Sequence, residues 1–253
     1  MKFYYKDFEY PSFLIKTNGY FLPANDDTPA GEDTPFISNE VSEYVIMPEN
    51  NKYYFDEWFI LYKINSNEDN LFDFNKAILD IGAHSGVYSF KSNFKYAYSF
   101  EPNKKMFPFL NINLMLHDKY FESKTFNVLL SDKNEMITFD GFSAALNDSE
   151  LQSEYFNSNN AEKIYSHTLD EYNLNNIGFI KIDVEGMEEK VLRGGLGTII
   201  RNNYPPILFE LWDVGFYGMT EEKHNSLEKF LTDLGYNILW YWGNDMTHLA
   251  IHN

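Results

Sequence analysis

The stretch AILDIGAHSG, residues 77–86, decides how this chain folds. It starts as a short apolar run, turns at glycines 82 and 86, and leads into residues 85–95, which have the length of a helix. A strand, a glycine turn and a helix in this order form the repeating unit of parallel sheets. Glycine lets the backbone approach a ligand closely, and open α/β sheets bind nucleotides at this edge.

Strands and helices alternate along the rest of the chain. We expect strands at 96–101, 125–131, 177–184 and 206–212, and helices at 105–117, 187–200 and 221–234. A hairpin is predicted around residues 136–140. Residues 236–242 and 247–252 flank a Gly-Asn-Asp turn, which predicts a final antiparallel hairpin. The whole pattern predicts an α/β fold with a doubly wound, mostly parallel sheet and an antiparallel edge.

Composition and charge restrict the partners of the protein. Aromatic residues make up 18% of the 253 residues, which favours a ring-bearing partner such as a sugar. The net charge of −18 argues against nucleic acid and anionic membrane surfaces. The absence of cysteine excludes disulfides, thiolate nucleophiles and Cys-ligated metals.

The chain is expected to be soluble and cytoplasmic, because it has no signal-like apolar segment and no membrane-spanning apolar run. We predict an N-terminal appendage over residues 1–74, which would cover the acceptor site, and a catalytic domain over residues 75–253. Residues 140–160, rich in Ser, Asn and Gly, are predicted to form a lid over the site. The sequence does not determine the oligomeric state.

A nucleoside site is predicted at the first glycine turn. Glu101 follows the second strand, about twenty residues after Asp80, where an acidic residue can bind ribose hydroxyls. His84 occupies the region where a dinucleotide fingerprint needs a small glycine beside the pyrophosphate. This argues against a nicotinamide dehydrogenase and favours a nucleoside without phosphates, such as S-adenosylmethionine.

Several motifs together resemble the FkbM-type O-methyltransferases over about residues 75–215. The matching segments are residues 78–86, 100–103, 168–171, 180–186 and 188–195. The resemblance implies a class I methyltransferase fold with a seven-stranded sheet, S-adenosylmethionine as donor, and a hydroxyl acceptor on a sugar or polyketide. It also implies that Asp80, Gly82 and Gly86 line the methionine end of the donor and that Glu101 holds the ribose. His84, which is also expected to contact the cofactor, departs from the asparagine common in the family.

Four further residues are expected to contact the cofactor or the acceptor from strand ends. Ser131 and Asp132 would follow the third strand, where class I methyltransferases place adenine contacts; solvated turn residues are the alternative. Glu210 and Trp212 end a later strand and would line the acceptor pocket, beside Asp213. The alternative for this last group is a core tryptophan with solvated acids.

The segment Lys181-Ile182-Asp183-Val184-Glu185 carries the predicted catalytic residues. Charged residues are unexpected in a strand buried on both faces, yet Lys181 interrupts this one and two carboxylates close it. Asp183 and Glu185 would take the acceptor proton; alternatively they only begin the next helix, with Lys181 as their counter-ion.

A metal-independent reaction is favoured because no dense ligand motif is visible. A divalent cation held by Asp183, Glu210 or Asp213 is the alternative. The rival function is a non-catalytic nucleoside- or glycan-binding protein that keeps the same fold.

Overall fold

The computed structural model describes residues 60–141, 144–145, 161–215, 219–240, 242 and 246–252, and the backbone of residues 3–5 and 8–10. Strands β1 (Phe3–Tyr5) and β2 (Phe8–Tyr10) pair antiparallel. Most of the expected lid over 140–160, most of the predicted appendage and the 243–245 turn lie outside the described residues.

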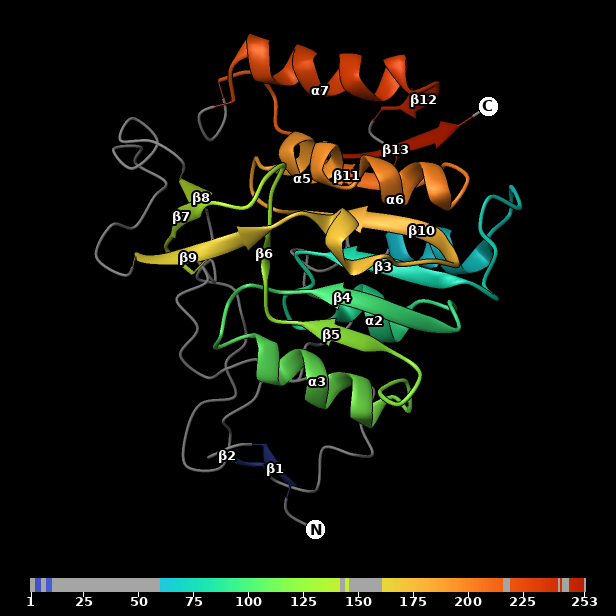
Figure 1. The fold of residues 1–253 in the computed structure, drawn as a ribbon. Coiled ribbons are helices and arrows are strands. Elements are labelled where there is room, and N and C mark those ends of the chain that lie inside the picture. The colour runs from blue at the N-terminus through green and yellow to red at the C-terminus, as the bar shows by residue number, and fades with distance from the viewer. Residues whose placement is uncertain are drawn as a thin grey trace.

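The main sheet has seven strands in the order β12-β13-β11-β10-β3-β4-β5 (Figure 1). β11, β10, β3, β4 and β5 run parallel, whereas β12 and β13 are antiparallel to their neighbours. This confirms the predicted fold class. Their bounds are β3 Ala77–Ile81, β4 Tyr96–Phe100, β5 Lys124–Phe126, β10 Ile177–Ile182, β11 Ile207–Glu210, β12 Tyr236–Leu239 and β13 Thr247–His252.

Pairing of β10 with β3 brings the two predicted motifs together. Lys181 lies opposite Asp80, and Ile182 lies opposite Ile81. Because the strands are parallel, their carboxyl ends reach the same edge of the sheet. The glycine turn after β3 and the carboxylates after β10 therefore share this edge.

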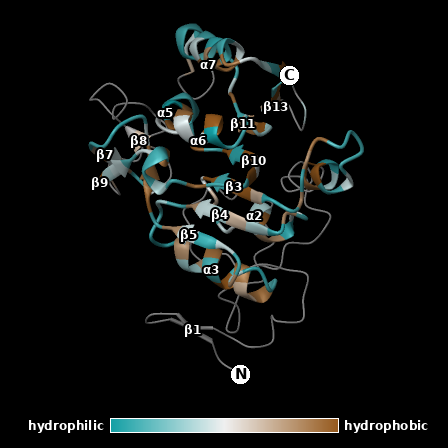
Figure 2. Ribbon diagram, turned by 45° about the vertical axis from the view of Figure 1, so that its right-hand side comes forward, coloured by the Kyte–Doolittle hydropathy of each residue, from teal (hydrophilic) through white to brown (hydrophobic). Residues whose placement is uncertain are grey.

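Helices cover both faces of the main sheet. One face carries the helical residues 60–66, α2 (Val87–Lys91) and α3 (Phe107–Leu116), packed in a cluster that includes Phe94 and Phe179. The other face carries the short 3-10 turn η2 (Leu169–Tyr172), α5 (Glu188–Gly194), α6 (Leu196–Arg201) and α7 (Glu221–Asp233). Figure 2 shows α7 with hydrophilic residues on its outer side, while Leu227, Phe230 and Leu231 are buried.

Two predicted helices differ from the observed ones. The helix expected at 187–200 is divided at Gly195, where a Cβ atom would come 2.6 Å from Leu169. The helix expected at 85–95 spans only residues 87–91, because α2 begins after Gly86, whose φ is +87°, and ends before Ser92, whose backbone is extended. Residues 60–74 contribute Ile60, Ile64 and Phe72 to the same core as β3.

A second, four-stranded sheet was not predicted as a whole, although it contains the hairpin expected around residues 136–140, as β7 paired with β8. It has the order β6-β9-β7-β8, with β6 Leu129–Leu130, β7 Met136–Phe139, β8 Ala144–Ala145 and β9 Glu162–His167. Figure 1 shows β7, β8 and β9 beyond the end of the main sheet to which the arrowheads of β3, β4 and β10 point. The single strand expected at 125–131 is therefore wrong, because the chain leaves the main sheet after Phe126 and joins this second sheet at Leu129.

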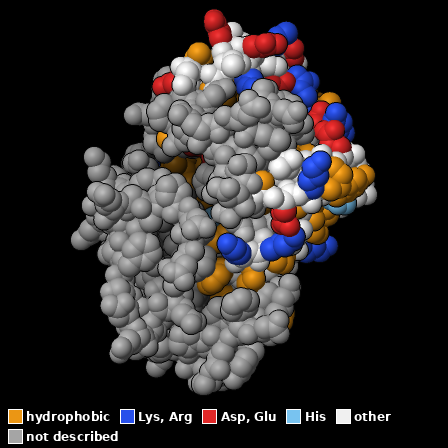
Figure 3. Space-filling model, turned by 90° about the vertical axis from the view of Figure 1, so that its left-hand side faces the viewer, with side chains coloured by type: hydrophobic (Ala, Val, Ile, Leu, Met, Phe, Trp, Pro, Cys, Tyr) orange, Lys and Arg blue, Asp and Glu red, His pale blue; other side chains and the backbone are white. Residues whose placement is uncertain are grey.

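The surface beside this second sheet has mixed charge. Viewed from that side, Lys and Arg side chains lie among Asp and Glu side chains over the part of the molecule that is described (Figure 3). None of the helices within the described ranges is long and apolar enough to cross a membrane.

Candidate active site

The glycine turn after β3 has a backbone that other residues could not adopt. Gly82 has φ +69°, and a Cβ atom there would come 1.8 Å from the carbonyl oxygen of Asp183. Gly86 has φ +87°, and its Cβ would come 2.5 Å from the Leu110 side chain. Both glycines are needed because the turn packs directly against the neighbouring strand end and α3.

Glu101 holds this turn through main-chain hydrogen bonds. Its Oε2 accepts from the N–H of His84, and its Oε1 accepts from the N–H of Asn103, both at 2.7 Å. Burial raises the pKa of Glu101, while the charge of His84 and the two hydrogen bonds oppose that rise. Each carboxylate oxygen keeps a further lone pair, so ribose hydroxyls can still donate to it. The predicted donor-binding roles of Glu101 and His84 stay predictions.

Asp80 is fully buried beneath the turn. Its Oδ2 accepts from the Ser89 hydroxyl at 2.5 Å, and that hydroxyl also contacts the Ser99 hydroxyl at 2.7 Å. Burial raises the pKa of Asp80, and the nearby Lys181 opposes the rise. In this structure Asp80 accepts a hydrogen bond from α2 and pairs with Lys181. A direct contact between Asp80 and the donor remains a prediction.

Lys181 links the glycine turn after β3 to the carboxylates after β10. Its Nζ donates to the carbonyl oxygen of Gly82 at 2.8 Å. The same Nζ lies 3.7 Å from Asp80 Oδ1 and 3.4 Å from Asp183 Oδ2. Lys181 is 6% exposed, and its ammonium is the counter-ion of the buried Asp80 and of the partly exposed Asp183.

Three carboxyl groups meet at the edge of the sheet. Asp183 and Glu185 follow β10, Glu210 ends β11, and each offers one oxygen within 4.8 Å of the others. Burial and then the charge of Asp183 raise the pKa of both Glu185 and Glu210 to about 9. Glu185 and Glu210 thus bind protons at neutral pH, and the spacing of the three carboxyl groups would also suit a divalent cation. Asp213 is exposed and does not belong to this group.

Trp212 lies next to the turn that carries these carboxyls. A Cβ atom at Gly186 would come 3.5 Å from the Trp212 ring, and Trp212 is 8% exposed. It belongs to the main hydrophobic core, as the alternative interpretation expected. The structure brings Glu210 into the carboxyl group, whereas an acceptor contact by Trp212 stays a prediction.

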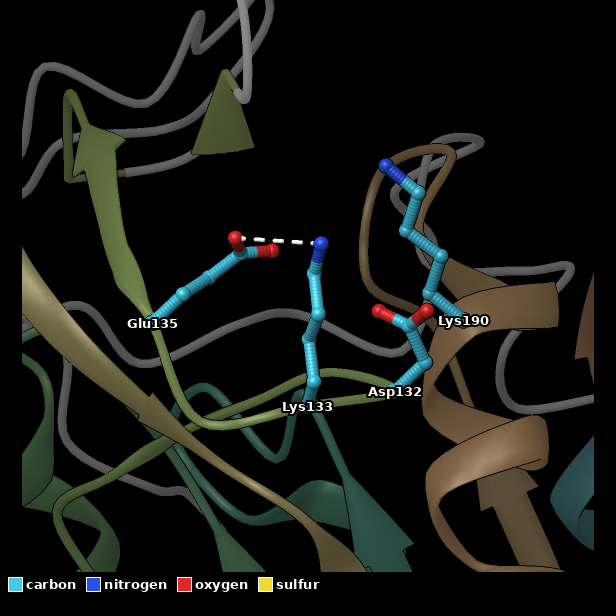
Figure 4. A pocket seen from close by; sticks show the side chains of 4 residues that line it. All are labelled: Asp132, Lys133, Glu135 and Lys190. Carbon is cyan, nitrogen blue, oxygen red and sulfur yellow. Dashed lines mark ion pairs between the residues drawn. The ribbon is translucent and has the colours of Figure 1, made fainter.

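Ser131 and Asp132 follow β6 of the second sheet instead of a main-sheet strand, so the premise of their predicted adenine contact is not met. Ser131 is buried. A Cβ atom added at Gly194 would lie 2.1 Å from the carbonyl oxygen of Ser131, so α5 packs closely against this residue. Figure 4 shows Asp132 in a small pocket that is also lined by Lys133, Glu135 and Lys190, with an ion pair between Lys133 and Glu135.

Two asparagines have structural roles that were not predicted from the sequence. Asn127 follows β5 and donates its side-chain amide to the carbonyl oxygen of Glu101 at 2.8 Å. Asn103 donates to the carbonyl oxygen of Gly141 at 2.7 Å and so connects the Glu101 turn to the second sheet. The Glu-Pro-Asn sequence at 101–103 was visible, but its reach to residue 141 depends on tertiary structure.

Comparison with known proteins agrees with this arrangement. A family model of the methyltransferase FkbM domain matches residues 80–238, more than half of the chain. The FkbM methyltransferase from Methylobacillus flagellatus KT aligns over 77% of this chain at 15% identity and a TM-score of 0.51. This chain covers 50% of that protein.

Two other solved structures are more distant. An O-methyltransferase from Bacillus cereus in complex with SAH aligns over 79% of each chain, at 12% identity and a TM-score of 0.42. The SAH-bound methyltransferase PaMTH1 from Podospora anserina aligns over 78% of this chain and 77% of its own, at 12% identity and a TM-score of 0.44. No curated protein matches the chain significantly.

The residues at the glycine turn after β3 have the shape and chemistry that binding of S-adenosylmethionine requires. Gly82 and Gly86 form a bend that Cβ atoms would fill, and Glu101 places a carboxylate at the end of the adjacent strand. The strand order, the glycine turn and the domain match all indicate a methyltransferase fold. The chain belongs to the FkbM methyltransferase family.

Proposed function

We propose that this protein transfers the methyl group of S-adenosylmethionine to a hydroxyl group of a sugar or glycan, with Asp183 accepting the hydroxyl proton. The observation that carries this proposal is the contact between the two motifs. The carbonyl oxygen of Asp183 lies against Gly82, and its N–H donates to the carbonyl oxygen of Ile81 at 3.1 Å. Asp183 is thereby fixed beside the glycine turn after β3, where an acceptor oxygen would have to lie.

Gly82, Gly86 and Glu101 would hold the donor, with Glu101 on the ribose hydroxyls. When bound, S-adenosylmethionine supplies an electrophilic methyl group on a positively charged sulfur. A carboxylate on that sulfur would stabilise the ground state more than the transition state, because the positive charge disappears during transfer. We therefore assign Asp183 to removing the proton from the acceptor hydroxyl.

The surroundings of Asp183 support its role as a base. Its side chain is 39% exposed, so an acceptor can reach it, and the Lys181 ammonium fixes its direction at 3.4 Å. Glu185 and Glu210, with their raised pKa values, retain protons at neutral pH and can donate hydrogen bonds to acceptor oxygens. A neutral, hydroxyl-rich acceptor could receive hydrogen bonds from these two groups while Asp183 takes the proton of the hydroxyl that is methylated.

The proposed reaction needs no metal. Glu185 and Glu210 would have to release their protons before a divalent cation could bind between them and Asp183. A cation would therefore bind more tightly as pH rises, and chelation distinguishes the two mechanisms.

A direct test is methyl transfer from labelled S-adenosylmethionine to a panel of mono- and oligosaccharides. We expect label on the sugar and acceptor-dependent release of S-adenosylhomocysteine. Donor binding without release in the presence of any panel member would instead support the non-catalytic alternative. Transfer to a non-sugar hydroxyl would retain the activity and reject the sugar.

A further inference from the structure

Glu188 is a buried carboxyl group that the proposed chemistry does not use. It is the first residue of α5 and is only 3% exposed. Its Oε1 accepts from the N–H of Val184 at 3.0 Å and from the N–H of Gly186 at 3.3 Å. One oxygen therefore binds the main chain on both sides of Glu185.

The turn that Glu188 binds has an unfavourable backbone. Glu185 has φ +55° and Gly186 has φ +90°, so two successive residues lie in the left-handed region. A residue with a side chain stays in this region only when its surroundings determine the conformation. The hydrogen bonds to Val184 and Gly186 enclose the strained residue and supply such a constraint.

The opposite side of the turn is fixed by apolar packing. Met187 is buried in a cluster with Leu129, Ile137 and Phe139 of the second sheet, and Val184 packs against this cluster. The turn is therefore held between the Glu188 carboxyl and the second sheet. Its backbone position determines where the Glu185 carboxyl lies relative to Asp183 and Glu210.

We propose that Glu188 is a positioning residue, which holds the 184–186 turn in its left-handed conformation and so places Glu185 in the acceptor site. This inference rests on the proposed function, because Glu185 is taken to contact the acceptor. Glu188 itself touches neither donor nor acceptor. What it contributes is a hydrogen-bond acceptor, and a neutral side chain with an oxygen in the same place can replace it.

Three variants separate positioning from a general loss of stability. Glu188→Ala removes the acceptor for both N–H groups, and Glu188→Gln keeps a carbonyl oxygen there. Glu189→Ala is the matched control, because it removes the next carboxylate of α5, which binds Arg193 and Ser226 away from the turn. Each variant is assayed for thermal unfolding, SAH affinity, methyl transfer to the best sugar of the panel, and amide exchange of residues 183–187.

We expect Glu188→Ala to lower kcat/KM for the sugar at least about tenfold, while SAH affinity changes less than about threefold. Exchange of the Val184 and Gly186 amides should accelerate in Glu188→Ala. Both properties should return close to wild type in Glu188→Gln and remain unchanged in Glu189→Ala.

The inference is overturned if Glu188→Ala keeps wild-type exchange at 184 and 186, or if Glu188→Gln is as impaired as Glu188→Ala. If Glu188→Ala does not fold, Glu188→Gln decides alone: wild-type exchange and transfer support the inference, and loss of either rejects it. Failure of the proposed function looks different. In that case Asp183→Asn keeps its turnover, while exchange at 184 and 186 still reports on Glu188.

Discussion

Replacing Lys181 with methionine tests the buried network that joins the two motifs. Methionine keeps the length of the side chain but removes the ammonium, which leaves the fully buried Asp80 without its cation at 3.7 Å. Two unit charges at that distance interact by about 4–5 kcal/mol at an effective dielectric constant of about 20. Breaking a buried ion pair from one side typically costs about 3–5 kcal/mol. We therefore expect Lys181→Met to lower Tm by roughly 6–20 °C.

The pH dependence of this loss has a definite sign. Burial raises the pKa of Asp80 above its ordinary value of 3.8, and removal of Lys181 would raise it further. An acid whose pKa is higher in the folded state destabilises that state above the raised pKa, and the penalty disappears below the ordinary one. The defect of Lys181→Met should therefore be largest at neutral pH and shrink as the pH falls toward 3.8.

The assay is thermal unfolding of three variants over a range of pH. Lys104→Met is the control, because Lys104 forms a shorter ion pair with Glu162, at 2.9 Å, but is 64% exposed. An exposed pair contributes about 0–1 kcal/mol, so this variant should stay close to wild type. Asp80→Asn combined with Lys181→Met should recover most of the loss. Equal Tm values for Lys181→Met and Lys104→Met, or no recovery in the double variant, would refute the reasoning.

Two further predictions concern the donor carboxylate and the strained turn. Glu101→Ala should weaken S-adenosylmethionine binding about tenfold to a hundredfold while the protein stays folded, because hydrogen bonds to a charged carboxylate contribute about 1.5–3 kcal/mol; calorimetry that finds wild-type affinity would remove Glu101 from the ribose. Glu185→Gly should be more stable than Glu185→Ala by about 1 kcal/mol, since only glycine is relaxed at a positive φ. Urea unfolding measures this difference, and equal stability would show that the turn is unstrained in solution.

The main sheet and the glycine turn after β3 could be predicted because their signals are local. The apolar run at 77–81 and glycines 82 and 86 lie within ten residues of one another, and the strand order follows from the fold class. Parallel strands end at one edge, so Asp183 and Glu210 could be expected near each other before any geometry was known. Lys181 stood out because a lysine in a doubly buried strand needs a partner.

The second sheet could not be predicted from the same kind of signal. Its strands have two to six residues, and β6 consists only of Leu129 and Leu130, too few to show any periodicity. The apolar run therefore looked like one strand up to Ser131, although Asn127 ends its main-sheet part. The left-handed backbone of Glu185 was also hidden, because sequence signals positive φ through glycine and asparagine.

The roles of buried carboxyl groups depend on distant partners. Glu188 entered the expectations from sequence only as part of the segment 188–195, without a role, and an acid in the first turn of a helix is common. Its bonds to Val184 and Gly186 appear only once the turn between β10 and α5 is folded. Burial raises the pKa of Glu188 to about 7, and this burial arises from tertiary packing that no local sequence pattern reports.

In the proposed reaction, Asp183 takes the proton from the acceptor hydroxyl that receives the methyl group. The most direct measurement is single-turnover methyl transfer by Asp183→Asn at saturating S-adenosylmethionine, with and without a strong chelator. Asp213→Asn is the matched control, because Asp213 is exposed and outside the carboxyl group. We predict nearly normal donor binding and a rate at least about a hundredfold lower in Asp183→Asn, with wild type and Asp213→Asn unaffected by chelation. Near-wild-type turnover in Asp183→Asn, or loss of wild-type activity on chelation, would contradict the account.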